Sequence, residues 1–315
     1  MTKCKVLIIG AGAVGLSIAA KISENADVSV VCRKRHSDSI AKNGLLMDGI
    51  WGEKTVCNIN CITEKNPAKN DDYDFIFLTS KSTDTEKLCD EYKGLMSGKP
   101  VVSIQNGIGN EEIISGFTDI VLGATITTNF QATGDGRVNV NSESGSMKIG
   151  FFPDDSLINY NANEILDNII EILTKSGIPV EKSSNIKSAI WEKSLLNIAV
   201  NPLTAILSVN TGELLDENLK EIVSEIIYEA FEVIKAEKIS VKWNDAEDYL
   251  SYLFEYLLPA FYTSYTSMYQ DLKLNRMTEI DFINGAIVKR GKDHGIITPY
   301  NSFVSGLVRY KQKKS

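Results

Sequence analysis

The first half of the chain alternates short apolar runs with longer segments of mixed polarity, a pattern that predicts strands alternating with helices. The apolar runs are residues 5–9, 28–32, 75–79, 101–104 and 120–124, and helical patterns lie at residues 16–23, 83–95 and 111–115. This alternation favours a mostly parallel sheet covered by helices. Residues 133–150 are rich in Gly, Ser and Asn, and we expect them to form hairpins at the far edge of that sheet.

The pattern changes around residues 176–188, where a Gly-Ile-Pro turn and a polar stretch end the strand-rich half. Beyond this stretch the pattern is helical to the end of the sequence. We therefore predict two domains, an α/β domain at residues 1–184 and a helical domain at residues 185–315. The length of 315 residues agrees with two domains of ordinary size.

Composition and charge exclude several classes of protein. Hydrophobic residues make up 43% and charged residues 23%, which is ordinary for a globular protein. No apolar run reaches the roughly 18 residues of a membrane-spanning helix, and glycines interrupt the segment that most resembles a signal peptide, so we expect a cytoplasmic protein. The net charge of −8 repels nucleic acids and anionic membranes, and we expect neither as a partner. The basic end at residues 311–315 is expected to be frayed.

The histidines and cysteines argue against a metal site. His36 and His294 are the only two histidines, too few for a multi-histidine site. Cys57 and Cys61 are four positions apart, but no second pair completes a zinc site. We therefore expect no bound metal, and we interpret the five cysteines as packing or surface residues. His294 precedes a glycine in a helix-ending pattern, which indicates a structural role.

A glycine-rich turn follows the first apolar run and precedes a helical pattern, the context in which the spacing G-x-G-x-x-G indicates dinucleotide binding. Gly10 would permit the tight turn, Gly12 would let a pyrophosphate approach the backbone, and Gly15 would let helix and strand pack closely. The helix amino terminus would supply free N–H groups for phosphate. The alternative is a glycine turn without a ligand. The cofactor contacts predicted here are Gly10, Ala11, Gly12, Ala13, Val14 and Gly15.

The residues after the second apolar run favour NADP(H) over NAD(H). An NAD-preferring site usually places Asp or Glu there, but this chain has Cys32 followed by Arg33, Lys34 and Arg35. A guanidinium group matches phosphate in a bidentate arrangement, which suits the extra 2′-phosphate of NADP. We predict Arg33 as the principal contact, with Lys34 or Arg35 assisting; the alternative is a solvated basic loop.

Two further polar groups follow predicted strands of the same sheet. Lys81 comes just after residues 75–79, and Asn106 lies in a Gln-Asn-Gly turn just after residues 101–104. Ligands in such sheets bind beyond the carboxyl ends of the strands. We therefore predict that Lys81 and Asn106 lie near the cofactor, against the alternative of ordinary loop contacts.

A narrow polar stripe marks an otherwise apolar helix in the second half. On a helix, Lys193, Asn197 and Asn201 share one face because they are four residues apart, and most of their neighbours are apolar. Such a helix is buried, and buried amides and ammonium groups need polar partners. The stripe therefore faces a ligand or a structural hydrogen-bond network. Pro202 is expected to kink or end the helix just after the stripe.

A second set of polar residues, Ser264, Ser267 and Glu279, comes later in the helical half. A carboxylate at position 279 could pair with Lys193 and set its position and pKa, or it could be an ordinary surface group. Eight aromatic side chains between Tyr249 and Tyr269 indicate a stripe of core residues, part of which could be the face of a homodimer.

In several sequence motifs the chain resembles the ketopantoate reductases (2-dehydropantoate 2-reductases). The matching motifs occur in order and span nearly the whole chain: GAGAVG, QNG, WEKSLLNIAVNPLTA, TSMYQD and TEIDFING, with a more diffuse match over residues 136–150. The combination of W-x-K-x-x-x-N-x-x-x-N-P with T-E-I-D is specific, whereas the glycine motif alone is not.

This resemblance implies an amino-terminal Rossmann domain and an all-helical carboxyl-terminal domain like that of 6-phosphogluconate dehydrogenase, with the active site in the cleft between them. It implies NADPH-dependent reduction of 2-dehydropantoate to (R)-pantoate, on the route to pantothenate and coenzyme A. By position in the motifs, Lys193 looks like the catalytic lysine and general acid, and Glu279 like its carboxylate partner. Lys81 and Asn106 would lie near the nicotinamide, and Arg33 at the 2′-phosphate. The implied substrate contacts are Asn106, Asn197, Asn201, Ser264 and Ser267.

Some positions depart from the family pattern and bear on substrate identity. Ser264 stands where some members carry Asn, and Asn275 stands where Gly is common. Residues 136–150 lack a frequent His and are one residue longer. Two alternatives therefore stay open: an NADP-dependent reductase of another branched 2-oxo acid, and a non-catalytic NADP(H)-binding sensor.

Overall fold

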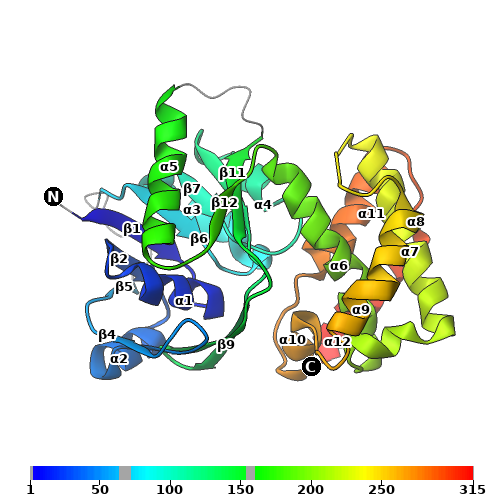
Figure 1. The fold of residues 1–315 in the computed structure, drawn as a ribbon, viewed down its shortest axis with the longest axis horizontal. Helices are drawn as coiled ribbons and strands as arrows, with labels where there is room; N and C mark the ends of the chain where they lie inside the picture. Colours follow the sequence, from blue (N-terminus) through cyan, green and yellow to red (C-terminus); the bar gives the residue numbers. More distant parts are fainter. Residues whose placement is uncertain (1–2, 64–71, 154–159, 315) are drawn as a thin grey trace. The chain divides into compact units, whose positions relative to one another are not determined.

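The computed structural model describes residues 3–63, 72–153 and 160–314, and the chain forms two compact units (Figure 1). The first unit comprises Met1–Gln105 and Asn110–Lys187, and the second comprises Asn106–Gly109 and Ser188–Ser315. Four residues that follow a strand of the first unit therefore belong to the second. The domain boundary between residues 184 and 185 stays a prediction.

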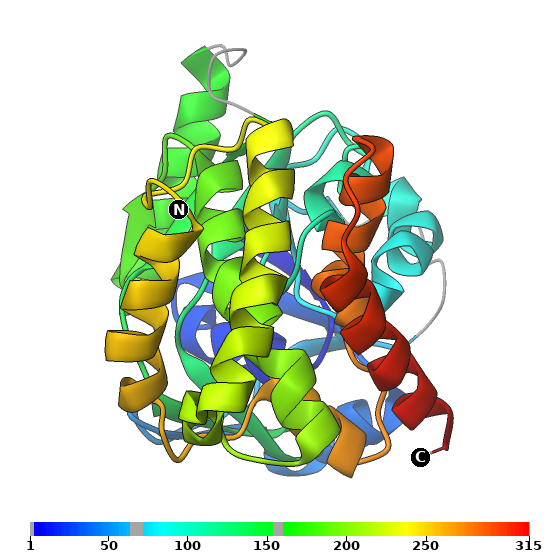
Figure 2. The same cartoon turned by 90° about the vertical axis from the view of Figure 1, so that its right-hand side faces the viewer.

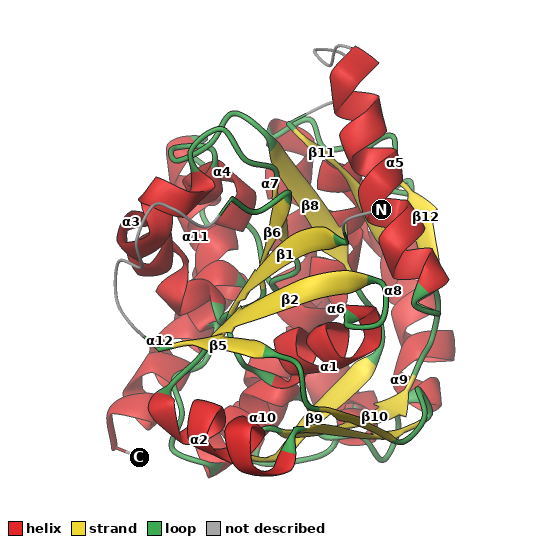
Figure 3. Cartoon of the chain, turned by 90° about the vertical axis from the view of Figure 1, so that its left-hand side faces the viewer, coloured by secondary structure: helices red, strands yellow, loops and turns green. Residues whose placement is uncertain are grey.

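The first unit is built on a sheet of eight strands in the order β12-β11-β8-β7-β6-β1-β2-β5 (Figure 3). All neighbouring strands are parallel except β8 and β11, which are antiparallel. The predicted α/β class is confirmed, and each of the five predicted strands is found within two residues of its expected bounds. The strands are β1 (Cys4–Ile9), β2 (Ala26–Val31), β5 (Asn60–Ile62), β6 (Phe75–Leu78), β7 (Val101–Ser103), β8 (Val121–Thr125), β11 (Met147–Phe152) and β12 (Val180–Lys182).

Helices cover both faces of this sheet, which explains why its strands read as continuous apolar runs. Alternate residues of β1 enter two different core clusters: Val6 and Ile8 pack with residues of α1 and α5, and Leu7 and Ile9 with residues of α3. The helices of this unit are α1 (Ala13–Ile22), α2 (Lys34–Asn43), α3 (Thr85–Met96), α4 (Asn110–Ile114) and α5 (Tyr160–Lys175).

A second, four-stranded sheet corrects part of the expectation for residues 133–150, of which residues 147–150 do lie in the large sheet, in β11 beside its edge strand β12. Strands β9 (Asn129–Gly134) and β10 (Arg137–Ser142) do form an antiparallel hairpin, but they pair with β3 (Leu45–Gly49) and β4 (Lys54–Val56) in the order β4-β3-β10-β9. The hairpin therefore does not extend the large sheet. The pairing of β3 with β10 joins segments about ninety residues apart, which the local pattern does not reveal.

The second unit is helical, as predicted (Figure 2). Its core includes fully buried Trp191 and Tyr249, whereas Tyr256, Tyr262 and Tyr265 of the aromatic stripe are exposed. Its helices are α6 (Ile186–Leu207, whose first two residues lie in the first unit), α7 (Glu217–Ala236), α8 (Ala246–Tyr252), α9 (Leu258–Ala260), α10 (Ser267–Lys273), α11 (Asn284–Asp293) and α12 (Pro299–Lys314).

Pro202 is expected to kink or end the helix, and it does not end it, because α6 continues for five residues beyond it to Leu207; the kink stays a prediction. A proline in a helix leaves the carbonyl four residues earlier without its usual donor. Here that carbonyl, on Ile198, accepts a hydrogen bond of 3.0 Å from Asn284 Nδ2. A side chain from another element thus replaces the missing backbone donor.

The basic end of the chain is not frayed over residues 311–314, which complete α12. Lys311 Nζ donates to the carbonyl oxygens of Ala205 and Ile206 and so caps the last turn of α6. Asn275 has φ of 53°, a left-handed conformation that Gly and Asn adopt more readily than other residues. None of the helices within residues 3–63, 72–153 and 160–314 has the length and apolar character needed to cross a membrane.

Candidate functional site

The glycine turn of the first unit has a geometry that larger residues would disrupt. Gly10 has φ of 122°, and a Cβ there would lie 2.6 Å from the backbone nitrogen of Ser80. A Cβ on Gly15 would lie 2.1 Å from the carbonyl oxygen of Gly10, so α1 packs directly against the turn. At Gly12, in contrast, no atom from the described part of the chain lies within 4 Å of the Cβ position. Two glycines therefore serve the packing of the turn, and the third leaves open space.

The amino terminus of α1 follows this turn and carries unsatisfied backbone donors. Its N-cap residue, Gly12, provides no side-chain cap, and its first turn contains no acidic residue. Ala11, Ala13 and Val14 are partly buried beside it. Thr79, which the sequence reading did not identify, donates from Oγ1 to the carbonyl oxygen of Gly10 at 2.8 Å and braces the turn from the end of β6. The arrangement can receive an anionic group at the helix terminus.

The three cations after β2 differ in their partners. Lys34 pairs with Asp38 at 2.8 Å, and Arg35 pairs with Asp135 at 3.2 Å. Arg33 is exposed at the N-cap of α2, and no carboxylate of the described residues pairs with its guanidinium. Arg33 is therefore the cation of this group that is most available to an added phosphate.

Lys81 lies just beyond β6, as predicted, and precedes a short 3-10 helix at Ser82–Asp84. Gln105, at the end of β7, donates from Nε2 to the carbonyl oxygen of Ser80 at 3.0 Å and to Thr85 Oγ1 at 2.8 Å. These bonds hold together the ends of two neighbouring strands. The next residue in sequence, Asn106, already belongs to the second unit.

In the second unit, Lys193 of α6 donates a hydrogen bond from Nζ to Asn106 Oδ1 at 2.9 Å. The ammonium group is partly buried, and its burial lowers the pKa of Lys193 from its usual value to about 8. The negative charge of Glu279 opposes this shift and favours the protonated amine. The structure therefore brings together Lys193, Asn106 and Glu279, and it gives the amine a pKa suited to proton transfer near neutral pH.

Anchors on both sides hold the segment that carries Glu279. Thr278, one residue earlier, donates to Gln312 Oε1 of α12 from its backbone nitrogen at 3.0 Å and its hydroxyl at 2.6 Å. Asp281, two residues later, pairs with Arg309 of the same helix at 2.6 Å. The sequence reading missed Arg309 and Gln312, because nothing near them in the chain indicates that α12 supports the T-E-I-D segment.

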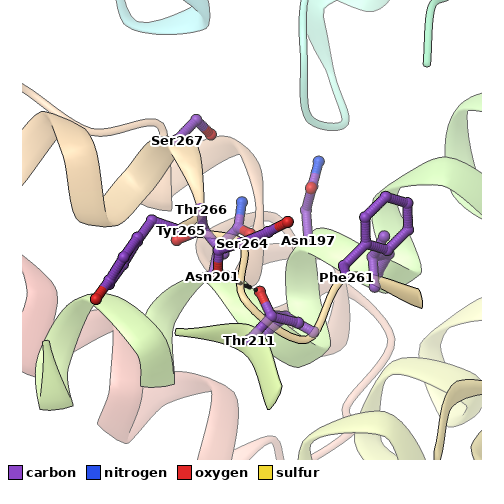
Figure 4. Close-up of a pocket in the computed structure, with 10 residues that line it drawn as sticks. Asn197, Asn201, Thr211, Phe261, Ser264, Tyr265, Thr266 and Ser267 are labelled. Atoms are coloured by element: carbon purple, nitrogen blue, oxygen red, sulfur yellow. Dashed lines mark hydrogen bonds between the residues drawn. The ribbon is translucent and has the colours of Figure 1, made fainter. Parts of the chain in front are cut away.

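Four of the predicted substrate contacts line one pocket in the second unit (Figure 4). Asn197 and Asn201 come from α6, Ser264 comes from the segment before α10, and Ser267 is the first residue of α10. The pocket has a volume of about 180 Å³. Its other walls are side chains that the sequence reading did not single out for this role: Leu196, Val200, Thr211, Phe261, Tyr265 and Thr266.

Hydrogen bonds fix the serine-bearing wall of this pocket. The carbonyl oxygen of Ser264 accepts from the backbone nitrogen of Thr211 at 2.9 Å and from its hydroxyl at 3.1 Å. Thr266 caps the amino terminus of α10 through Tyr269 N at 3.2 Å, and its hydroxyl bonds to that of Thr204 in α6 at 2.9 Å. The Thr-Ser-Met order at residues 266–268 is an N-cap signal that could have pointed to this role.

The Lys193 cluster and the pocket are neighbours on α6. Asn197 follows Lys193 by one helical turn, or about 6 Å along the axis, and lies on the same face. A proton donor, several amide groups and two hydroxyls thus lie along one helix face and the segment beside it. This combination can bind the anionic group of a small polar molecule and donate a proton to another of its oxygen atoms.

No three His, Cys, Asp or Glu side chains gather as a metal site would require within residues 3–63, 72–153 and 160–314. The expectation that the protein binds no metal stays a prediction. His294 lies at the C-cap of α11, with Nε2 3.0 Å from Glu237 Oε1, which agrees with a structural role.

Comparison with known proteins identifies one family over nearly the whole chain. The family described as "Ketopantoate reductase PanE/ApbA" matches residues 6–154, and its carboxyl-terminal part, "Ketopantoate reductase PanE/ApbA C terminal", matches residues 185–312. A 2-dehydropantoate 2-reductase from Pyrococcus horikoshii is 32% identical, covering 98% of this chain and 97% of that protein. A 2-dehydropantoate 2-reductase from Aquifex aeolicus is 30% identical, with coverage of 98% and 97%.

Solved structures share the fold. A PanE/ApbA family ketopantoate reductase from Ralstonia eutropha has a TM-score of 0.86 and 27% identity, covering 98% of this chain and 99% of that chain. A ternary structure of D-mandelate dehydrogenase with NADH and anilino(oxo)acetate has a TM-score of 0.86 and 28% identity, covering 98% of both chains. The resemblance drawn from the motifs is confirmed.

Proposed function

The chain belongs to the ketopantoate reductase PanE/ApbA family, and from this premise we propose that it reduces 2-dehydropantoate to (R)-pantoate with NADPH. The observation that carries the proposal is the Lys193 cluster. A partly buried amine with a pKa of about 8 is held by Asn106 and stands on the same helix face as Asn197 and Asn201 of the pocket.

Reduction of a ketone needs a group that stabilises the negative charge developing on the ketone oxygen. When NADPH is bound, it supplies the hydride to the ketone carbon. The protonated Lys193 amine stabilises the charge that develops on the oxygen and then transfers its proton to it. Asn106 directs the amine through the 2.9 Å hydrogen bond, and Glu279 keeps a larger fraction of it protonated.

The side chains that line the pocket suit a small branched 2-oxo acid. The hydroxyls of Ser264 and Ser267 can bind a carboxylate, and the amides of Asn197 and Asn201 can bind carbonyl and hydroxyl oxygens. The apolar wall of Leu196, Val200 and Phe261 can pack against methyl groups. A polar end and an apolar wall together favour 2-dehydropantoate over a purely polar oxo acid.

The first unit fits a nicotinamide dinucleotide with a 2′-phosphate. The open space at Gly12 and the uncapped amino terminus of α1 suit a pyrophosphate. Arg33 has no carboxylate partner among the described residues, whereas Lys34 and Arg35 each have one. We therefore assign the preference for NADPH to Arg33, and assign Lys81 to the nicotinamide end of the cofactor.

Steady-state kinetics with 2-dehydropantoate, comparing NADPH with NADH, tests this proposal. We expect turnover with a higher kcat/KM for NADPH, and Lys193→Ala should lose turnover while still binding NADPH. Near-normal turnover in that variant would refute the assigned role of Lys193.

The same assay separates the two other readings. The similarity to D-mandelate dehydrogenase makes a panel of 2-oxo acids with aliphatic and aromatic side chains informative, although the names of the relatives favour 2-dehydropantoate. A higher kcat/KM for another 2-oxo acid would replace the substrate but keep the reaction. Binding of NADPH without turnover of any member of the panel would indicate a sensor.

A further inference from the structure

A buried asparagine supplies the hydrogen bond that Pro202 removes from α6. Proline has no N–H, so the carbonyl of Ile198, four residues earlier, lacks its helical donor. Asn284, the first residue of α11, donates from Nδ2 to that oxygen at 3.0 Å and is fully buried. Because an unpaired buried carbonyl is costly, the amide and the proline form a matched pair.

A second hydrogen bond fixes the orientation of the Asn284 amide. Asn284 Nδ2 also donates to Asn301 Oδ1 at 3.0 Å. Asn301, likewise fully buried, donates from Nδ2 to the carbonyl of Ile226 at 3.0 Å and to Glu229 Oε2 at 2.7 Å. Asn284 therefore connects α6 to a polar network that runs through α12 and α7, and its side chain has little freedom to rotate.

Three hydrogen bonds join the three segments that hold the proposed proton donor. Lys193 Nζ on α6 donates to Asn106. Ile108, two residues after Asn106, donates from its backbone to the carbonyl of Phe282 at 2.7 Å. Asn284, two residues after Phe282, donates to α6 at Ile198. The bonds close a ring that includes the amine, and Glu279 lies three residues before Phe282 on the third of these segments.

We propose that Asn284 is a positioning residue for the reaction proposed above: by replacing the backbone donor lost at Pro202, it holds α6 against the Glu279 segment and thereby places the Lys193 amine. The inference rests on the proposed function for its kinetic part. Asn284 acts only through α6 and touches neither substrate nor cofactor in this account.

The first test is Asn284→Ala. A shift of α6 of well under 1 Å would misplace the amine and change its burial, and we expect kcat to fall by about tenfold, with a shift in the pH profile of kcat/KM near pH 8. The matched control is Asn301→Ala, which removes an equally buried amide but leaves the bond to Ile198. Because Asn301 also supports the Asn284 amide, we expect this variant to lower the melting temperature by a similar amount but to lower kcat less than Asn284→Ala does.

The second test restores the missing donor. In Pro202→Ala, residue 202 regains an N–H that can donate to Ile198, so the helix no longer depends on Asn284. The double variant Asn284→Ala/Pro202→Ala should therefore recover most of the kcat and the wild-type pH profile, and its melting temperature should exceed that of Asn284→Ala alone. Recovery of this kind depends on the specific carbonyl and would not follow from a general loss of packing.

Two results would overturn the positioning role. One is an Asn284→Ala variant that keeps its kcat and pH profile and loses only thermal stability. The other is a double variant no more active than Asn284→Ala, with Pro202→Ala itself active. A wild-type protein that turns over no 2-oxo acid would instead overturn the proposed function, while the melting temperatures of the four proteins would still report the coupling between positions 202 and 284.

Discussion

The two units assemble their chemistry in opposite ways. In the first, six consecutive residues from Gly10 to Gly15 present backbone atoms at the end of a strand, and their geometry is set locally by glycines. In the second, side chains from four segments far apart in sequence come together around α6. A site formed by backbone atoms can thus be predicted from one sequence motif. A site formed by side chains depends on how segments distant in sequence pack together.

The largest expected effect comes from the second unit. Lys193→Met keeps most of the side-chain volume but removes the proton donor, and kcat should fall by about 10³-fold. NADPH binding, measured by fluorescence titration, should be little changed, since the predicted phosphate contacts at Gly10–Gly15 and Arg33 lie in the first unit. The control is Lys235→Met, which removes an exposed lysine of α7; a similar loss of kcat in both variants would contradict a specific role for Lys193.

Two glycine variants should separate packing from ligand approach in the first unit. Gly15→Ala forces a methyl group to 2.1 Å from the carbonyl oxygen of Gly10, and we expect it to lose several kcal/mol of unfolding free energy. The methyl group of Gly12→Ala would meet no atom of the described residues within 4 Å, so the stability of this variant should be unchanged. Its affinity for NADPH should nevertheless fall by about 100-fold, because the methyl group occupies the space for the pyrophosphate. Unfolding by urea and NADPH titration measure the two effects; tight binding by Gly12→Ala would exclude this turn as the phosphate site.

Arg33→Ser tests the one side-chain contact that we assign to the 2′-phosphate in the first unit, where the other phosphate contacts are backbone groups. Loss of one charge-assisted bond to the 2′-phosphate should raise the Kd for NADPH about 30-fold, which corresponds to about 2 kcal/mol, and leave the Kd for NADH unchanged. Arg35→Ser is the matched variant, because Arg35 already pairs with Asp135. Equal effects on both cofactors would place Arg33 outside the phosphate site.

The pH dependence should show the smallest effect, near the pKa of Lys193. The amine must be protonated to act as an acid, so kcat/KM for ketone reduction should be constant below a pH of about 8 and fall by up to tenfold per unit above it. The reverse oxidation needs the neutral amine and should rise through the same range. Rates measured in both directions with NADPH and NADP⁺ check the sign; a reduction rate that rises with pH would rule out the amine as the acid.

The sequence predicted the parts of the fold that are set locally. Strands buried on both faces are continuous apolar runs, and the glycine spacing identified the turn after β1. The second sheet escaped prediction because β3 and β10 pair across about ninety residues. The continuation of α6 past Pro202 escaped it too, because the compensating donor, Asn284, lies 86 residues away from Ile198.

The candidate site was predictable only in outline. Helical spacing placed Lys193, Asn197 and Asn201 on one face of a helix, but it did not show which residues pack against that face. The pairing of Lys193 with Asn106 joins residues 87 positions apart, and the support of the Glu279 segment by Arg309 and Gln312 depends on α12. No local pattern encodes such contacts, and only the resemblance to the family indicated part of them.

Because Asn106–Gly109 belongs to the second unit, the two units cannot be separated by cutting the chain at one position. A fragment that begins at Ser188 would lack the Ile108 side chain, which is 4% exposed in that unit's core, and the Asn106 oxygen that accepts the hydrogen bond from Lys193. Proteolysis or gene truncation at a single position therefore cannot yield both halves intact. A chimaera that exchanges the helical half between relatives must carry these four residues with it, as a short graft in the other half of the gene.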